Sequence, residues 1–477
     1  MVSVYPWFAG IHSLISKLFI SKVRSLDSMD CNFDTGINVI CGPNGCGKTT
    51  ILESIHLLAQ GFSFRSRDLR ELITWKQNEL ILRGEFEDDG RSRMRALRVH
   101  SRGNEVRENG ESLKSPTSFF GTCPAVIMQP SDIELLRGGP EVRRHWLDEI
   151  LCYRSAANAL VLRRYKRVLQ QRNKWLKEFK QNGSAVGGED LYRVLTQQLI
   201  ELGAKLWAAR ISLSKEVSEI ITRYYRKLSG GVDEITCAYK SSILKTLDAL
   251  DAAEPMSDEM MDEIPANAGT LMAAGRSVAE SECCAKMAAE NCAGAAYVTN
   301  GAAVENAVGN AAANAIENAV ANAPGAACVE CANDDADVVS EEMLRNAFAR
   351  KLADLEFVER LQGMTMAGPH RDDLALCVSG YEMRSVGSQG QCRSAAVAMR
   401  FAAVDVASRY LTKPILLLDD IFAELDVNRR DAVASLIREK ECQVVIATPQ
   451  AEDLPFKADV EIQLEVGSRK LEAGSRK

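Results

Sequence analysis

A glycine-rich loop near the start of the chain has the residue types and spacing needed to hold phosphate groups. Residues 42–49 fit the pattern G-x-x-x-x-G-K-[ST]. The apolar run 36–41 before the loop indicates a buried strand, and residues 50–58 after it have apolar residues at helical spacing. Glycines allow backbone N–H groups to wrap phosphate oxygens, and the helix adds its positive N-terminal end. The expected phosphate-binding residues are Gly42, Pro43, Asn44, Gly45, Cys46, Gly47, Lys48, Thr49 and Thr50.

A second stretch, far along the chain, would complete a nucleoside triphosphate site. Residues 414–420 are an apolar run that ends in the carboxylates Asp419 and Asp420. Such a run indicates a strand buried on both faces, and its C-terminal end lies where α/β sheets bind ligands. We expect Lys48 to reach the outer phosphates and Thr49 and Asp419 to hold Mg²⁺. Asp420 would orient or deprotonate the attacking water.

Other stretches resemble motifs of the ABC-type ATPases. Gln129 follows an apolar strand and matches the Q-loop, which senses the metal and the γ-phosphate, so we add it to the Mg²⁺ contacts. Asp426 matches the D-loop at a dimer interface, and Thr448 stands where a transporter ATPase has its switch histidine. The loop before residue 394 resembles the signature motif, which serves the nucleotide of a second subunit; the alternative is a simple N-capped helix. Its expected site residues are Ser388, Gln389, Gly390 and Gln391.

Taken together, these motifs resemble the RecF family of bacterial recombination and replication-repair ATPases. The resemblance covers residues 16–250 and 340–460, and the N-terminal extension, an insertion at 252–340 and a repeated tail depart from it. The stretches that carry it are 42–49, 64–65, 136–140, 143–144, 147–148, 171–173, 368–374, 388–391, 418–420 and 424–426.

The resemblance implies a fold and a function. The fold would be α/β, an ABC-type P-loop ATPase head split in sequence with an inserted helical lobe. The protein would be a weak ATPase that uses ATP and Mg²⁺ as a switch. It would bind double-stranded and single-stranded DNA near gaps as an ATP-sandwiched homodimer, and with RecO and RecR it would promote RecA loading. It would be cytoplasmic.

Residue composition divides the chain into three expected parts. The head would comprise residues 1–125 and 360–477, and the helical lobe residues 126–251 and 340–359. Residues 252–339 would be a low-complexity, acidic, disordered insertion, because their Ala-, Asn- and Glu-rich composition buries too little apolar surface to offset ordering. A zinc half-site at Cys328 and Cys331 is a weak alternative interpretation of part of this insertion.

Charge is unevenly distributed, and this bears on nucleic acid binding. The chain has a net charge of −7, but residues 252–340 carry 14 acidic and two basic side chains, a net of −12, which leaves the remainder at +5. From Arg137 to Lys180 there are 12 basic and four acidic side chains. Phosphate contacts position a protein without reading sequence. The alternative is a solvated amphipathic face. The candidate DNA contacts are Arg143, Arg144, Arg163, Arg164, Lys166, Arg167 and Arg172.

Several other classes of protein fit the sequence less well. No uninterrupted apolar stretch is long enough for a transmembrane helix, and no secretory signal is evident. The scattered 14 cysteines indicate free thiols in a reducing compartment. An alternative is another SMC-like or nuclease-coupled ABC ATPase, although a nuclease requires a further carboxylate cluster that the sequence does not offer. A transporter ATPase would leave residues 368–374 and the basic helices unexplained.

Overall fold

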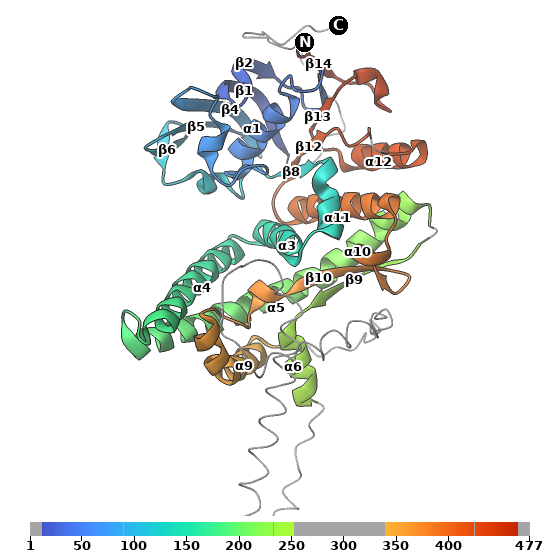
Figure 1. Cartoon of the computed structure of the whole chain (residues 1–477). Helices are drawn as coiled ribbons and strands as arrows, with labels where there is room; N and C mark the ends of the chain where they lie inside the picture. The colour runs from blue at the N-terminus through green and yellow to red at the C-terminus, as the bar shows by residue number, and fades with distance from the viewer. Residues whose placement is uncertain (1–11, 89, 232, 252–338, 424, 466–477) are drawn as a thin grey trace, which may run out of the picture. The chain divides into compact units, whose positions relative to one another are not determined.

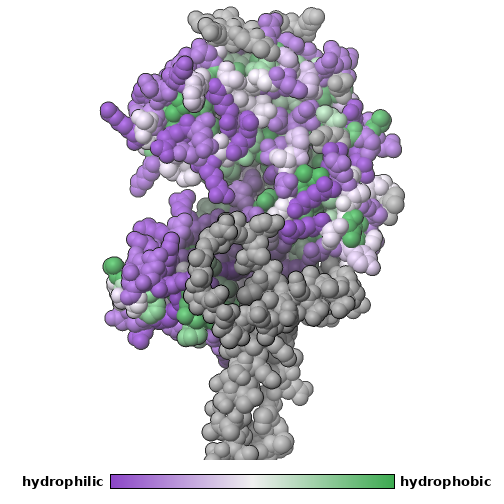
Figure 2. Space-filling model, in the orientation of Figure 1, coloured by the Kyte–Doolittle hydropathy of each residue, from purple (hydrophilic) through white to green (hydrophobic). Residues whose placement is uncertain are grey.

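The computed structural model of the chain describes residues 12–88, 90–231, 233–251, 339–423 and 425–465. Within these residues the strands form sheets of six, five and three strands. Figure 1 shows the two larger sheets together, with the long helices and the small sheet beside them. The face in Figure 2 is largely hydrophilic. Among the described residues, no helix combines the length and apolar character needed to cross a bilayer.

The six-stranded sheet is antiparallel throughout. Alternate side chains of its strands face the core, as the period of two requires. The strands, in sheet order, are β2 (Leu26–Asn32), β1 (Ser13–Val23), β4 (Glu79–Asp88), β5 (Arg91–His100), β6 (Gly103–Glu108) and β7 (Glu111–Leu113).

The five-stranded sheet is parallel and brings together widely separated parts of the chain. Residues 125–128, 415–418 and 444–447 of this sheet are continuous buried apolar runs, because both faces of a parallel sheet are covered. The last part of the chain alternates helix and strand, as α11, β12, α12 and β13, and then adds the strand β14. The strands, in sheet order, are β14 (Val460–Gln463), β3 (Ile37–Cys41), β13 (Val444–Thr448), β12 (Ile415–Asp419) and β8 (Ala125–Met128).

Helix α1 (Lys48–Gln60) lies between the two large sheets and contacts strands of both. Every residue of α1 except Thr49 is buried, including Glu53, whose carboxylate pairs with Arg24 (2.6 Å). The helix ends where expected, at Gly61, whose left-handed conformation (φ 80°) closes the last turn. This position fixes the start of the helix against the edge of the parallel sheet.

The helical lobe is built on α5, which packs against α4, α9, α11 and the small sheet. The expected helical stretch after residue 141 is two helices, because Ser155 ends the first and caps the second by accepting from the Ala157 N–H. Ser340 caps α9 by accepting from the Met343 N–H. The main elements are α3 (Pro140–Arg154), α4 (Ala156–Asn182), α5 (Gly188–Ser229), α9 (Glu341–Gln362), α11 (Gln389–Tyr410), β9 (Ile235–Lys240), β10 (Asp373–Val378) and β11 (Tyr381–Glu382). The remaining helices are α2 (Glu134–Arg137), α6 (Ser242–Asp251), α10 (Met383–Val386) and α12 (Val427–Lys440).

The contacts between elements place the boundary between head and helical lobe at different residues from those expected from the sequence. Strand β10 pairs with β9, and α11 packs against α5, so both belong with the lobe. Strand β8 pairs with β12 in the head. We therefore propose that the head comprises residues 12–128 and 411–465 and that the lobe lies between them. Residues 252–338 of the expected insertion, with the cysteine pair, lie outside the described residues.

The turn after α9, residues 368–374, connects elements of the helical lobe through hydrogen bonds to Asp372. Its buried carboxylate accepts hydrogen bonds from Trp207 Nε1 (2.5 Å), Tyr239 OH (2.7 Å) and Ser241 Oγ (2.8 Å). Burial raises the pKa of Asp372 despite these donors. Since an unsatisfied buried carboxylate is costly, the three donors and the turn stabilise one another.

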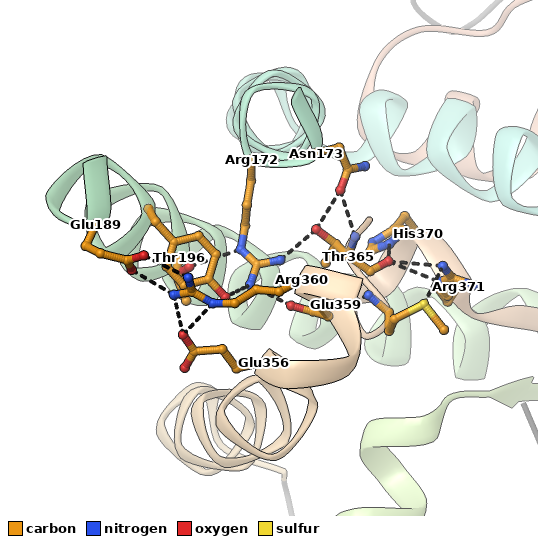
Figure 3. A network of polar contacts seen from close by, with 12 residues as sticks. Arg172, Asn173, Glu189, Thr196, Glu356, Glu359, Arg360, Thr365, His370 and Arg371 are labelled. Atoms are coloured by element: carbon orange, nitrogen blue, oxygen red, sulfur yellow. Dashed lines mark hydrogen bonds and ion pairs between the residues drawn. The ribbon is translucent and has the colours of Figure 1, made fainter. Parts of the chain in front are cut away.

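Two arginines expected on a DNA surface are buried instead, which corrects that part of the prediction. Arg143 makes a bidentate ion pair with the Asp373 carboxylate (2.7 and 2.8 Å). Arg172 is fully buried and pairs with Glu359 (2.7 Å), as Figure 3 shows. Arg172 continues the helical spacing of the buried residues Leu162, Tyr165 and Val168, and this spacing in the sequence is the signal that places it inside.

Replacing Arg172 tests whether this arginine is structural. Because Arg172→Ala leaves the Glu359 carboxylate buried without its cation, we expect the free energy of unfolding to fall by about 3–5 kcal/mol. The matched control on the same helix, Arg163→Ala, is exposed and should change it by less than about 0.5 kcal/mol. Urea denaturation measures both, and equal effects would contradict the assignment.

His370 makes the stability of the lobe sensitive to acid. The Tyr165 hydroxyl and His370 Nδ1 lie 2.7 Å apart, and Nε2 donates to the Thr365 carbonyl (3.3 Å). Burial lowers the pKa of His370 from 6.5 to about 4. Between these two values the unfolded chain binds the proton more tightly, so stability is lost as the pH falls through that window.

The size of this effect follows from the two pKa values. From about pH 7 to about pH 5, His370 should remove about 2 kcal/mol from the free energy of unfolding. Denaturation of His370→Gln should show a pH dependence weaker by that amount. His56 is also buried with a lowered pKa, but it is present in both proteins and cancels in the comparison. Identical pH profiles would show that His370 titrates normally.

Candidate nucleotide-binding site

The candidate site lies along one edge of the parallel sheet, where its strands end. Thr448 of β13 is in register with Cys41, directly before the glycine-rich loop. Met128 of β8 is in register with Leu418, so Gln129 and Asp419 follow neighbouring strands. The structure thus brings residues 42–50, Gln129, Asp419 and Thr448 to one edge, the usual ligand-binding edge of such sheets.

The loop between β3 and α1 needs glycine for steric reasons. Gly47 has φ 108°, a conformation that other residues rarely adopt, and a Cβ there would lie 2.6 Å from the side chain of Leu26. Gly47 is also the N-cap of α1, so the first N–H groups of the helix face the loop. These groups and the helix dipole make the loop suited to an anion.

Two hydrogen-bond sets hold the reactive side chains of the loop. Lys48 Nζ donates to the carbonyl oxygens of Gly42 (2.6 Å) and Pro43 (3.1 Å), so its ammonium lies over the concave side of the loop. The Thr49 hydroxyl donates to the Asp419 carboxylate, 3.0 Å from each oxygen. A hydroxyl and a carboxylate oxygen at this separation are oxygen ligands of the type that Mg²⁺ uses beside phosphates.

The electrostatics around Asp419 fit a cation. Burial, together with the neighbouring Asp420 charge, raises the pKa of Asp419, while the Thr49 hydrogen bond and the charges of Arg65 and Lys48 lower it. A divalent cation would offset both unfavourable contributions, so the residues present fit Mg²⁺. Arg65, from the loop after α1, was not among the predicted site residues, and its place beside Asp419 is a finding of the structure.

Asp420 has a strained backbone. Its φ of 50° places a non-glycine residue in the left-handed region, and its N–H donates to the Ala447 carbonyl (2.9 Å). Such conformations persist where the surrounding structure enforces them and are common at functional sites. The strain turns the chain away from the strand direction immediately after Asp419.

The loop that resembles a signature motif caps α11. Ser388 Oγ accepts from the Gln391 N–H (3.2 Å), and Gln391 Oε1 accepts from the Ser388 N–H (2.9 Å). Gln391 Nε2 also donates to Asp233 (2.8 Å). Among the described residues, these side chains bond to one another and to Asp233 rather than to the phosphate loop. Ser388 and Gln389 are exposed, so their surface is accessible to another molecule.

Arg429 connects the D-loop stretch with the signature-like loop. Asp426 is the N-cap of α12 and accepts from the Arg429 N–H (3.0 Å) and its guanidinium (2.5 Å). These bonds lower the pKa of Asp426. The same guanidinium lies against Gly390, where a Cβ would be 2.8 Å from Nη1. The two stretches therefore form one continuous surface.

A buried ion pair joins α11 to the residue after β8. Arg400 donates to Asp132 Oδ1 (2.6 Å), and Asp132 Oδ2 accepts from the Gln129 N–H (2.9 Å). Glu149 lies 3.8 Å from Arg400 and shares its charge. The helix that begins at the signature-like loop is thus linked to Gln129. Sequence reasoning missed Arg400, although it falls on the apolar side of α11.

The remaining DNA candidates differ in exposure. Arg163, Arg164, Lys166 and Arg167 are exposed on α4. Arg144 is half-buried and donates to the Asp372 carbonyl (2.6 Å). The exposed members form a basic face on one helix.

Comparison with known proteins finds a matching ATPase family model and several relatives that share the name RecF. A family model described as an AAA domain matches residues 17–224. "DNA replication and repair protein RecF" of Geobacter metallireducens is 28% identical over 441 residues, covering 92% of this chain and 94% of that protein. The protein of the same name from Bacillus cereus is 26% identical and covers 89% of each chain.

The chain is similar to proteins named RecF along about nine-tenths of its length. The solved structure described as the recombination mediator protein RecF-ATPrS in the RecFOR pathway matches 97% of this chain and 98% of its own, with a TM-score of 0.70 and 22% identity. The resemblance to RecF is therefore confirmed. So is the fold class, an α/β ATPase head split in sequence by a helical lobe, since the RecF fold spans nearly the whole chain.

The link between α11 and Gln129 can be tested by a double-mutant cycle. Arg400→Met and Asp132→Asn should each destabilise the protein, and the double variant should lose less than their sum by about 1–3 kcal/mol, because one interaction is removed twice. Denaturation curves measure the coupling. The exposed pair Lys227–Glu439 (2.8 Å) is the control, with expected coupling below about 1 kcal/mol. Additive effects at Arg400 and Asp132 would refute the link.

Proposed function

We propose that the chain is an ATP-dependent DNA-binding protein of recombinational repair and replication restart. The observation that carries the proposal is the hydrogen bond between Thr49 and Asp419, which assembles a bipartite phosphate and metal site from residues 370 positions apart. Its relatives named RecF, which match along about nine-tenths of the chain, support the biological setting. A solved RecF structure carries ATP in its description, which supports ATP as the nucleotide.

Within one copy, the chain would bind and orient Mg²⁺-ATP. The backbone N–H groups of residues 42 and 44–50 and the Lys48 ammonium would surround the β- and γ-phosphates. Thr49 and Asp419 would hold Mg²⁺, with Gln129 at the same edge, and Mg²⁺ would supply charge neutralisation of the phosphates. Asp420 would orient the attacking water and accept its proton.

A second copy would complete the site. Exposed Ser388, the N–H groups of Gln389, Gly390 and Gln391, and the N-terminus of α11 would face the γ-phosphate held by the partner. Asp426 and Arg429 border that surface and would lie at the same interface. Loss of the γ-phosphate on hydrolysis would remove these contacts, so the ATPase would act as a slow switch that opens the dimer.

The closed dimer would hold DNA through phosphate contacts. A basic face on α4 is supplied by the exposed side chains of Arg163, Arg164, Lys166 and Arg167. Half-buried Arg144 lies on the preceding helix, α3. Such contacts give little sequence specificity and strong salt dependence. RecO and RecR would be the partners through which the bound protein promotes RecA loading on single-stranded DNA.

Dimerisation and DNA binding with ATP test the proposal directly. The wild type should dimerise and bind DNA with ATP and Mg²⁺ and do neither with ADP. Lys48→Met should lose ATP binding, and Ser388→Arg should bind ATP but remain monomeric, because the bulky cation blocks the approach of the partner. Ser112→Arg, on exposed β7, is the matched control and should behave as the wild type. Analytical ultracentrifugation and fluorescence anisotropy measure the two properties.

The outcomes separate the parts of the mechanism. ATP-independent, monomeric DNA binding by all four proteins would overturn the switch. Dimerisation of Ser388→Arg at the wild-type ATP concentration would remove the signature-like loop from the interface, whatever the DNA affinity.

A further inference from the structure

A cavity of about 380 Å³ lies where the head loop after α1 meets α3 and α4 of the helical lobe. The cations that line it are Arg67 from the head and Arg144, Lys166 and Arg210 from the lobe. Two carboxylates, Glu141 and Asp148, are the acidic members of the lining. None of the phosphate-loop residues contributes to it, so it is separate from the nucleotide site.

The carboxylates do not neutralise this group of cations. Asp148 is already shared, with Arg210 Nη2 at 2.5 Å and Lys166 Nζ at 3.1 Å. The Glu141 carboxylate folds back toward Gly139 at the N-terminus of α3, where a Cβ would lie 2.3 Å from it. Arg67 has no hydrogen-bond or ion-pair partner among the described residues. The cavity therefore carries excess positive charge.

Arg144 is another cation of this cavity whose charge is not neutralised by a carboxylate hydrogen bond within the described part of the chain. Among the described residues, its one hydrogen bond goes to the Asp372 carbonyl (2.6 Å), which leaves most of its N–H groups available. Burial and the adjacent Arg210 charge lower the pKa of Arg144. Two guanidinium groups that oppose each other in a half-buried place are relieved by an anion, and guanidinium groups match phosphate oxygens in geometry.

The walls of the cavity indicate which anion fits. Besides the cations, Leu162, Leu169 and Tyr165 form an apolar side that is suited to a sugar ring rather than to a free ion. Lys166 lines the cavity and also belongs to the exposed basic residues of α4, so it is shared by the two. A chain of linked phosphates and sugars fits both features.

We propose that this cavity binds a sugar–phosphate unit of the DNA backbone and that Arg67 and Arg144 contact its phosphate from the head and from the lobe. The proposal rests on the proposed DNA-binding function and assigns it a defined phosphate site. Because the two arginines come from different lobes, a phosphate held between them would tie DNA binding to the arrangement of head and lobe.

The salt dependence of DNA binding tests this assignment. For a short duplex with ATP and Mg²⁺, Arg67→Glu and Arg144→Ala should each lower the slope of log K against log salt by about 0.9, the contribution of one phosphate contact. At about 0.1 M salt this corresponds to about eight-fold weaker binding. Arg107→Glu is the control, since Arg107 is exposed on β6 and also without a partner among the described residues.

Each result has a defined meaning. ATP binding and the melting temperature of Arg67→Glu should match those of the wild type, so this variant remains informative if Arg144→Ala fails to fold. If the wild type binds DNA and the salt-dependence slope of Arg67→Glu equals that of Arg107→Glu, the proposed phosphate site is wrong. Loss of inorganic phosphate binding in Arg67→Glu without a change in slope would assign the cavity to a free anion and also overturn it. Absence of wild-type DNA binding would instead contradict the proposed function.

Discussion

The parallel pairing of β3 with β13 is the interaction on which the candidate nucleotide site depends. It aligns Cys41 with Thr448, and through β12 it carries Asp419 to within 3.0 Å of the Thr49 hydroxyl. Neither half of the site can hold both phosphate and metal alone. The backbone hydrogen bonds of one sheet therefore set the geometry of the chemistry, and the side chains of the site add only local adjustments, such as the turn at Asp420.

The helical lobe is organised differently, around buried charge. Asp372, Arg172 and Arg210 are each buried and each paired or hydrogen-bonded several times. Replacing one partner of such a group costs more than the group contributes by itself, because a charge is left unpaired in a low-dielectric interior. The turn at residues 368–374 thus acts as a structural junction. The same junction orients Arg144, since its backbone supplies the carbonyl that this arginine contacts.

Local patterns predicted the parts of the fold whose causes are local. The phosphate loop, the ends of α1 and the apolar strand before Asp419 each follow from residues adjacent in sequence. The ion pairs of Arg143 and Arg172 do not, because their partners Asp373 and Glu359 lie 230 and 187 residues away. The net charge of α3 and α4 does not distinguish buried from exposed arginines. Helical spacing does, because Arg172 falls on the buried side of α4 and Arg163 on the exposed side. Arg400 was missed for the same reason, since its ion-pair partner Asp132 lies 268 residues away, and Arg65 was missed because its charge acts on Asp419, far along the chain.

The order of strands in the parallel sheet also has a consequence for synthesis of the protein. Both neighbours of β3, β13 and β14, come from the last part of the chain. At about 5–20 residues per second, the ribosome needs roughly 20–75 s to add the 370 residues that separate Thr49 from Asp419. During that time β3 lacks both of its neighbouring strands and α1 lacks its contacts with β12 and β13, and such exposed surfaces are prone to aggregation. The nucleotide site would therefore be among the last parts of the nascent chain to form.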